Sequence, residues 1–86
     1  MNESNARANE RTLLIVDDDA PLRTRLARAM ESRGFTVTAA ENVADGIELA
    51  VENPPAYAVI DLRLDDGNGF EIVHALQQAK PDCRIV

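Results

Sequence analysis

The chain has 86 residues, of which 15 are Asp or Glu and 9 are Lys or Arg, so its formal net charge is −6. This length fits one small domain, and the single Cys excludes both an internal disulfide and a Cys/His metal cluster. The start is polar, no apolar run approaches the ~20 residues of a membrane-spanning helix, and the acidic balance disfavours nucleic-acid binding, so we expect a soluble domain of the reducing cytoplasm.

The start of the chain predicts a tail and then a buried strand. Residues 1–10 are polar and lack periodicity, so we expect a flexible N-terminal tail before a domain over residues 11–86. Residues 13–16 form a continuous apolar run, which is typical of a strand buried on both faces. This run ends at three consecutive aspartates.

A helix and a second strand follow. Asp19 can cap the helix, Pro21 suits its first turn, and Gly34 ends it. Residues 35–39 alternate between apolar and polar, as in a half-exposed strand near a sheet edge. The apolar residues at helical spacing, which we expect to face the core, are Leu22, Leu26, Ala29 and Met30.

The second half of the chain repeats this pattern. Asn42 can cap a second helix, which must end before the Asn-Pro-Pro of residues 53–55. Residues 56–60 predict a third strand, residues 65–69 a loop, and residues 83–86 the start of a fourth strand. The expected inward faces of the second and third helices comprise Val43, Ile47, Ala50 and Val51, and Phe70, Ile72, Val73 and Leu76.

This alternation of strands and helices predicts an α/β domain with a parallel sheet and right-handed crossovers. In open sheets of this kind, sites lie beyond the carboxyl ends of the strands, where the strand order reverses. The first strand ends at Asp17 and Asp18, and the third ends at Asp61. If these strands are neighbours, their ends are about 4.7–4.9 Å apart, and the three carboxylates share one small space.

Three carboxylates in one space repel each other unless a proton, a cation or a basic side chain relieves them. Mg²⁺ fits this need because it takes carboxylate, carbonyl and water oxygens in an octahedral shell. The loop after Asp61 could add a backbone carbonyl, for which that of Arg63 is the candidate. Because the ion also neutralises a phosphoryl group, one carboxylate could act as the nucleophile that accepts this group.

Helix capping is the competing explanation for these acids. Asp17 and Asp18 could act only as caps, a role that we already expect for Asp19. Asp61 has no such role within reach, because the next helix begins near Asn68. The capping explanation is therefore weakest at Asp61.

Three segments resemble a response-regulator receiver domain. They are Leu-Ile-Val-Asp-Asp-Asp at residues 14–19, the Gly-Phe step at residues 34–35, and residues 59–69, which begin Val-Ile-Asp and end in Gly. Their order and spacing match that family, and the resemblance covers nearly all of residues 11–86. The segment that begins at Asp61 is most similar to the RegA/PrrA/ActR branch.

The resemblance implies a flavodoxin-like, doubly wound parallel sheet of strand order 2-1-3-4-(5) and a signalling module that is not an enzyme. Asp61 would be the phosphoacceptor. The phosphoryl group would come from a histidine of a sensor kinase or from a small phosphodonor. Asp18 would bind Mg²⁺ directly, Asp17 directly or through water, and Arg63 through its backbone carbonyl. In that branch a helix-turn-helix DNA-binding domain follows the receiver and controls transcription, and the partner kinase responds to redox state.

The chain departs from the family pattern in two ways. Asp65 stands where many receivers have Pro, and the chain stops at its fourth strand where receivers have about five strands and five helices. We therefore expect a receiver that is incomplete at the C-terminus and lacks the later switch Ser/Thr and Lys. An unpaired strand edge along residues 83–86 would favour a dimer or strand-exchanged self-association.

Two other functions remain open at this point. One is a Mg²⁺-dependent phosphatase with an Asp nucleophile, which resembles the haloacid dehalogenases. That chemistry needs a second acid two residues beyond the nucleophile, where this chain has Arg63, and it needs a longer chain. The other is an interaction fragment that cannot be phosphorylated and uses its acids only as caps.

Overall fold

The computed structural model describes residues 11–86, and the tail predicted for residues 1–10 lies outside the described residues. The expected alternation of strands and helices is confirmed, with most boundaries moved by a residue or two. The elements in chain order are β1 (Thr12–Val16), α2 (Ala20–Glu31), β2 (Thr36–Ala40), α3 (Val43–Glu52), β3 (Tyr57–Ile60), β4 (Arg63–Leu64), β5 (Gly67–Asn68), α4 (Phe70–Ala79) and β6 (Arg84–Ile85).

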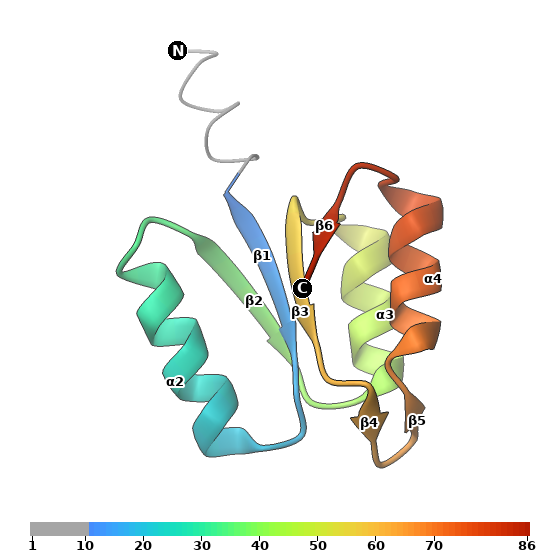
Figure 1. The fold of residues 1–86 in the computed structure, drawn as a ribbon, viewed down its shortest axis with the longest axis horizontal. Coiled ribbons are helices and arrows are strands. Elements are labelled where there is room, and N and C mark those ends of the chain that lie inside the picture. The colour runs from blue at the N-terminus through green and yellow to red at the C-terminus, as the bar shows by residue number, and fades with distance from the viewer. Residues whose placement is uncertain (1–10) are drawn as a thin grey trace.

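The four main strands form one parallel sheet in the order β2-β1-β3-β6 (Figure 1). In sequence order this is second, first, third and fourth, so the expected flavodoxin-like topology is confirmed. The first strand is central, and Val16 at its end pairs with Ala40 on one side and Ile60 on the other. The predicted adjacency of the first and third strands is therefore present.

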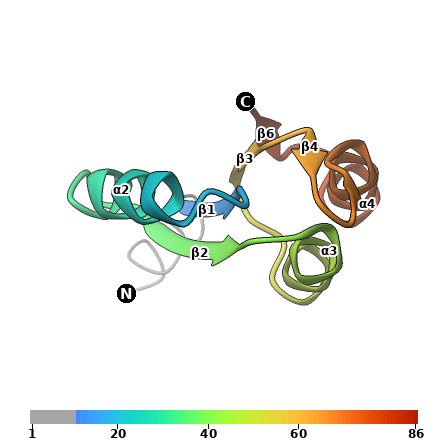
Figure 2. The ribbon, with the colours of Figure 1, turned by 90° about the horizontal axis from the view of Figure 1, so that it is seen from below.

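The helices cover the two faces of the sheet unequally. Figure 2 shows α2 on one side of the sheet, with α3 and α4 packed together on the other. The core lies between the sheet and the α3–α4 pair, as expected for amphipathic helices on a parallel sheet. Its buried residues are Leu14, Val16, Ala40, Val43, Ala50, Ala58, Ile60, Leu64, Ile72 and Leu76. Leu13 and Ile15 are also buried but lie outside this cluster, because successive strand residues face opposite sides of the sheet.

Side-chain caps fix where the first two helices begin. The Asp19 carboxylate accepts a hydrogen bond from the Leu22 N–H at 3.0 Å, and the Asn42 side chain accepts one from the Asp45 N–H at 2.8 Å. Both caps were predicted from residue type and position. Gly34 follows α2 with a positive φ of 95°, a conformation that favours glycine and turns the chain into β2.

Some predicted core positions are wrong. Phe70 is 62% exposed because it lies two positions before the fully buried Ile72 in α4, which places it on nearly the opposite side of the helix. Val51 is 58% exposed and Leu22 is 39% exposed. In the described chain α2 has no fully buried residue, because no second helix packs beside it on its face of the sheet.

The β4–β5 hairpin was also not predicted. Residues 63–68 read as loop because each strand has only two residues, too few to show an alternating pattern. Among the described residues, no helix is both long and apolar enough to cross a membrane.

Candidate metal centre

Backbone hydrogen bonds hold the ends of β1 and β3 side by side. The Asp61 N–H donates to the Val16 carbonyl at 2.9 Å, and the Asp17 N–H donates to the Ala40 carbonyl at 3.1 Å. The parallel ladders thus continue one residue beyond each strand. As a result Asp17 and Asp61 leave the sheet at the same edge.

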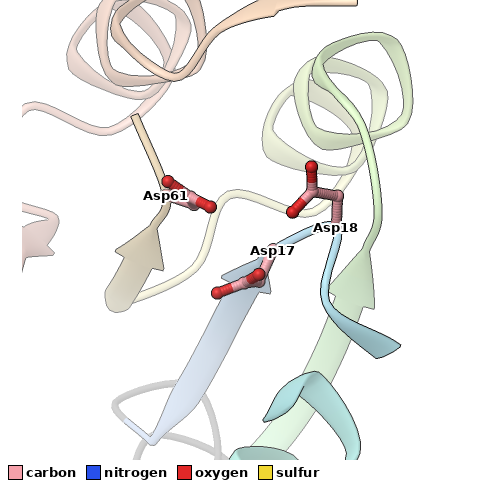
Figure 3. Close-up of side chains that lie close together, drawn as sticks. All are labelled: Asp17, Asp18 and Asp61. Atoms are coloured by element: carbon pink, nitrogen blue, oxygen red, sulfur yellow. The ribbon is translucent and has the colours of Figure 1, made fainter. Parts of the chain in front are cut away.

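The structure brings Asp17, Asp18 and Asp61 together (Figure 3). One carboxylate oxygen from each lies within 4.8 Å of the others, with Asp17 and Asp61 half-buried and Asp18 exposed. Mg²⁺ binds oxygen at about 2.0–2.1 Å, so oxygens on opposite sides of its shell are roughly 4.2 Å apart. The three carboxylates therefore fit around one ion after small adjustments.

Two of these carboxylates are oriented by backbone donors. Asp17 Oδ1 accepts from the Asp19 N–H at 2.9 Å, and Asp61 Oδ1 accepts from the Arg63 N–H at 2.9 Å. Each bond closes a local turn of the kind that Asp favours. Capping of α2 belongs to Asp19, so the structure does not use Asp17 or Asp18 for it.

The electrostatics of the site favour a bound cation. Partial desolvation, followed by the negative charges of Asp65, Asp61 and Asp17, raises the pKa of Asp18 above its ordinary value. A raised carboxyl pKa means that the ionised form is disfavoured where it lies. A divalent cation among these groups would remove that penalty.

An open pocket of about 360 Å³ adjoins Asp18. It is lined by Asp18, Glu41, Asn42, Asp65 and Asp66. Four of these five side chains are acidic, so the negative field extends from the cluster to the start of α3. Such a field attracts cations and raises their local concentration.

Sequence reasoning missed Arg23, whose guanidinium binds the backbone next to the aspartate cluster. Its Nη1 donates to the Asp17 carbonyl at 2.7 Å, and its Nη2 lies 3.8 Å from Glu41 Oε1. This guanidinium links the β1–α2 turn to the β2–α3 turn and places a positive charge behind the acids. Its position one helical turn after Asp19 was the available signal.

Gly69, which the sequence placed only within a loop, has a more specific role. A Cβ at Gly69 would collide with the carbonyl oxygen of Asp61 and would lie 2.8 Å from Ile60 Cγ2. The Gly69 N–H also donates to the Leu62 carbonyl at 3.1 Å, which closes the base of the hairpin. Glycine at this position therefore lets the segment after Asp61 return close to the sheet.

The family described as "Response regulator receiver domain" matches residues 13–86. The chain belongs to this family. The predicted resemblance is therefore confirmed, and residues 13–86 of the chain are a receiver sequence.

The receiver is similar to regulatory proteins of the predicted branch. It is 57% identical over 77 residues to the photosynthetic apparatus regulatory protein RegA of Cereibacter sphaeroides, covering 90% of this chain and 42% of that protein. It is 52% identical over 77 residues to the acid tolerance regulatory protein ActR of Rhizobium meliloti, covering 90% of this chain and 40% of that protein. The chain thus spans about two fifths of these relatives.

Solved structures share the receiver fold. A response regulator from Burkholderia pseudomallei, solved with a phosphorylated aspartic acid, a calcium ion and citrate, matches with a TM-score of 0.82 at 31% identity, covering 87% of this chain and 44% of that chain. The non-phosphorylated HemR receiver domain from Leptospira biflexa matches with a TM-score of 0.78 at 30% identity, covering 86% and 60%.

Proposed function

We propose that this receiver accepts a phosphoryl group on Asp61 from a histidine of a sensor kinase, with Mg²⁺ held by Asp17, Asp18, Asp61 and the backbone carbonyl of Arg63. The convergence of three carboxylates within 4.8 Å at the end of β1 and β3 is the observation that carries the proposal. A relative of the same fold contains a phosphorylated aspartic acid and a calcium ion, which supports the same chemistry here.

In the proposed reaction an oxygen of the Asp61 carboxylate attacks the phosphorus of a phosphohistidine. An O–P bond forms as the P–N bond breaks, and the imidazole leaves with the bonding electron pair and takes up a proton. Mg²⁺, when bound, neutralises charge on the phosphoryl oxygens. The product is an acyl phosphate on Asp61 and a free kinase histidine.

The chain's own residues prepare Asp61 for this step. The Arg63 N–H holds Oδ1, which leaves Oδ2 as the oxygen free of that bond to attack. Asp17 is fixed by the Asp19 N–H, so it needs no reorientation to contribute a ligand oxygen. Preorganised groups of this kind lower the barrier because no reorganisation is needed during the reaction.

The larger biological role follows from the relatives and is part of the proposal. RegA and ActR are named as regulatory proteins, and this chain covers about two fifths of each. We infer that the natural protein is a cytoplasmic transcription regulator in which a C-terminal helix-turn-helix domain binds DNA. The signal would be redox state or a related condition sensed by the partner kinase.

A phosphatase of the haloacid-dehalogenase kind is less well supported. Such an enzyme places a second acid two residues beyond its nucleophile, and Arg63 occupies that position. An interaction role without phosphorylation is disfavoured by the geometry, since capping explains neither Asp18 nor Asp61.

The test is phosphorylation of the complete natural protein by acetyl phosphate with Mg²⁺, followed by intact mass spectrometry. We expect one phosphoryl adduct that disappears in Asp61→Asn and when EDTA removes the metal. Continuous release of phosphate at enzymatic rates would instead favour the phosphatase. An adduct that persists in Asp61→Asn would overturn the assignment of the phosphoacceptor.

As a separate piece of 86 residues, the chain is proposed to self-associate. Within the described residues β6 pairs only with β3, so its other edge presents unpaired backbone groups. Sedimentation of the isolated piece should reveal a dimer or strand-exchanged species. A monomer that unfolds cooperatively would contradict this expectation.

A further inference from the structure

The β4–β5 hairpin, residues 63–68, follows the phosphoacceptor Asp61 along the chain and contacts the N-terminus of α3. Two-stranded hairpins are marginally stable by themselves, and this one pairs only Arg63 with Asn68 and Leu64 with Gly67. It therefore depends on anchors outside itself. One anchor is Leu64, which is buried in the core, and the other is Asp66.

Asp66 binds the first two backbone N–H groups of α3 with both carboxylate oxygens. Oδ1 accepts from the Val43 N–H at 2.8 Å, and Oδ2 accepts from the Ala44 N–H at 3.2 Å. These partners lie 23 and 22 residues away in the sequence, so the contact is tertiary. The helix dipole adds to the attraction, because a carboxylate is favoured at a helix N-terminus.

Asp66 is not required as the ordinary cap of this helix. Asn42 already fills that role by accepting from the Asp45 N–H. The Asp66 bonds lower the pKa of its carboxyl, with the Val43 N–H as the largest cause. The distinct effect of Asp66 is to tie the hairpin to α3.

The same hairpin begins with the Arg63 N–H that holds Asp61 Oδ1 at 2.9 Å. A hairpin that moved away from α3 would carry this donor with it. Building on the function proposed above, we propose that Asp66 is a positioning residue for phosphoryl transfer, which acts by clamping the β4–β5 hairpin to α3 and so fixing the Arg63 N–H on Asp61.

The experiment compares Asp66→Ala, Asp66→Asn and Asp45→Asn in the complete natural protein, with acetyl phosphate and saturating Mg²⁺. Misplacement of a catalytic group by about 1 Å can cost up to ~100-fold in rate, so we expect Asp66→Ala to slow phosphorylation of Asp61 about tenfold. Asp66→Asn should recover most of that loss, because its side-chain oxygen can still accept from Val43. Asp45→Asn removes a charge from the same turn of α3 and should stay within about twofold of the parent.

Amide NMR separates positioning from general destabilisation. In Asp66→Ala, at a temperature where the variant is folded, the Arg63 amide should shift and exchange faster together with those of Val43 and Ala44. If Asp66→Ala does not fold, Asp66→Asn carries the test, with an intermediate rate and a shifted Ala44 amide. A parent-like rate in Asp66→Ala, or an unchanged Arg63 amide, would overturn the clamp. A parent protein that takes no phosphoryl group would instead refute the proposed function, and the Arg63 amide would still decide the clamp.

Discussion

The two faces of the sheet carry helices of similar amphipathic pattern but very different burial. On one face α3 and α4 pack against each other and bury Val43, Ala50, Ile72 and Leu76. On the other face α2 has apolar residues at the same spacing, yet none of its described residues is fully buried. A hydrophobic stripe thus indicates which side of a helix faces inward, whereas the neighbouring helix determines how much is buried.

The largest difference between the faces should appear in Leu76→Ala. Leu76 is fully buried in the α4 side of the core, so its truncation leaves a cavity as well as losing burial. We expect a loss of about 3–4 kcal/mol in the free energy of unfolding. Urea unfolding of the complete protein and the variant measures it, and a loss below about 1 kcal/mol would contradict the assignment of the core to this face.

Gly46→Ala tests how closely α3 and α4 approach. A Cβ there would lie 2.7 Å from Ile72 Cδ1 and 3.3 Å from Val16 Cγ2, and both residues are fully buried. Overpacking costs about 1–3 kcal/mol and the gain in helix propensity offsets up to about 1 kcal/mol, so we expect a net loss of about 1–2 kcal/mol. A higher melting midpoint for the variant would show that the α3–α4 interface can accommodate the added methyl group, and would contradict the close approach.

Leu26→Ala provides the matched change on the opposite face. Leu26 is half-buried on α2, so its truncation removes less contact and leaves a cavity that solvent can enter. We expect a loss of about 1 kcal/mol, clearly below that of Leu76→Ala, in the same urea experiment. Equal losses at the two leucines would remove the distinction between the faces.

Asp18→Asn tests the cluster of aspartates at the carboxyl ends of β1 and β3, which lies between the two faces of the sheet. The pKa of Asp18 is raised in the folded state, so its ionised form opposes folding at neutral pH and its protonation favours folding. Asp18→Asn should therefore raise the melting midpoint slightly without divalent cations. Mg²⁺ should raise the midpoint of the parent but not of the variant, and an equal response in both would exclude Asp18 as a ligand.

Acid should loosen α3 at its N-terminus before it affects the packed core. The pKa of Asp66 is lowered below its ordinary value near 3.8, so its bonds to α3 are present above that value and are lost as the pH falls through the lower folded-state pKa. Hydrogen exchange of the Val43 and Ala44 amides, corrected for intrinsic rates, should accelerate only as the pH falls below the ordinary value of 3.8. Asp66→Asn serves as the control, and persistence of the pH effect in this variant would assign it to another group.

The order of elements could be predicted from the residue pattern, whereas the strand order, and with it the convergence of the three aspartates, followed from the resemblance to receiver domains. Residues 13–16 are apolar without interruption, and the acids follow them at the position where parallel strands open into a site. Local rules were also sufficient for the caps Asp19 and Asn42, because a cap depends on residues only three positions away.

Only the tertiary structure decided the remaining features. Asp66 accepts a hydrogen bond from a helix residue 23 positions away, and Arg23 joins two turns. Gly69 leaves room for the Asp61 carbonyl. None of these contacts produces a periodic pattern in the sequence. The exposure of the Phe70 and Leu22 side chains could not be predicted from the sequence either. The physical reason is that periodicity records which side of an element is apolar, whereas burial and positioning depend on which other elements come to lie beside it.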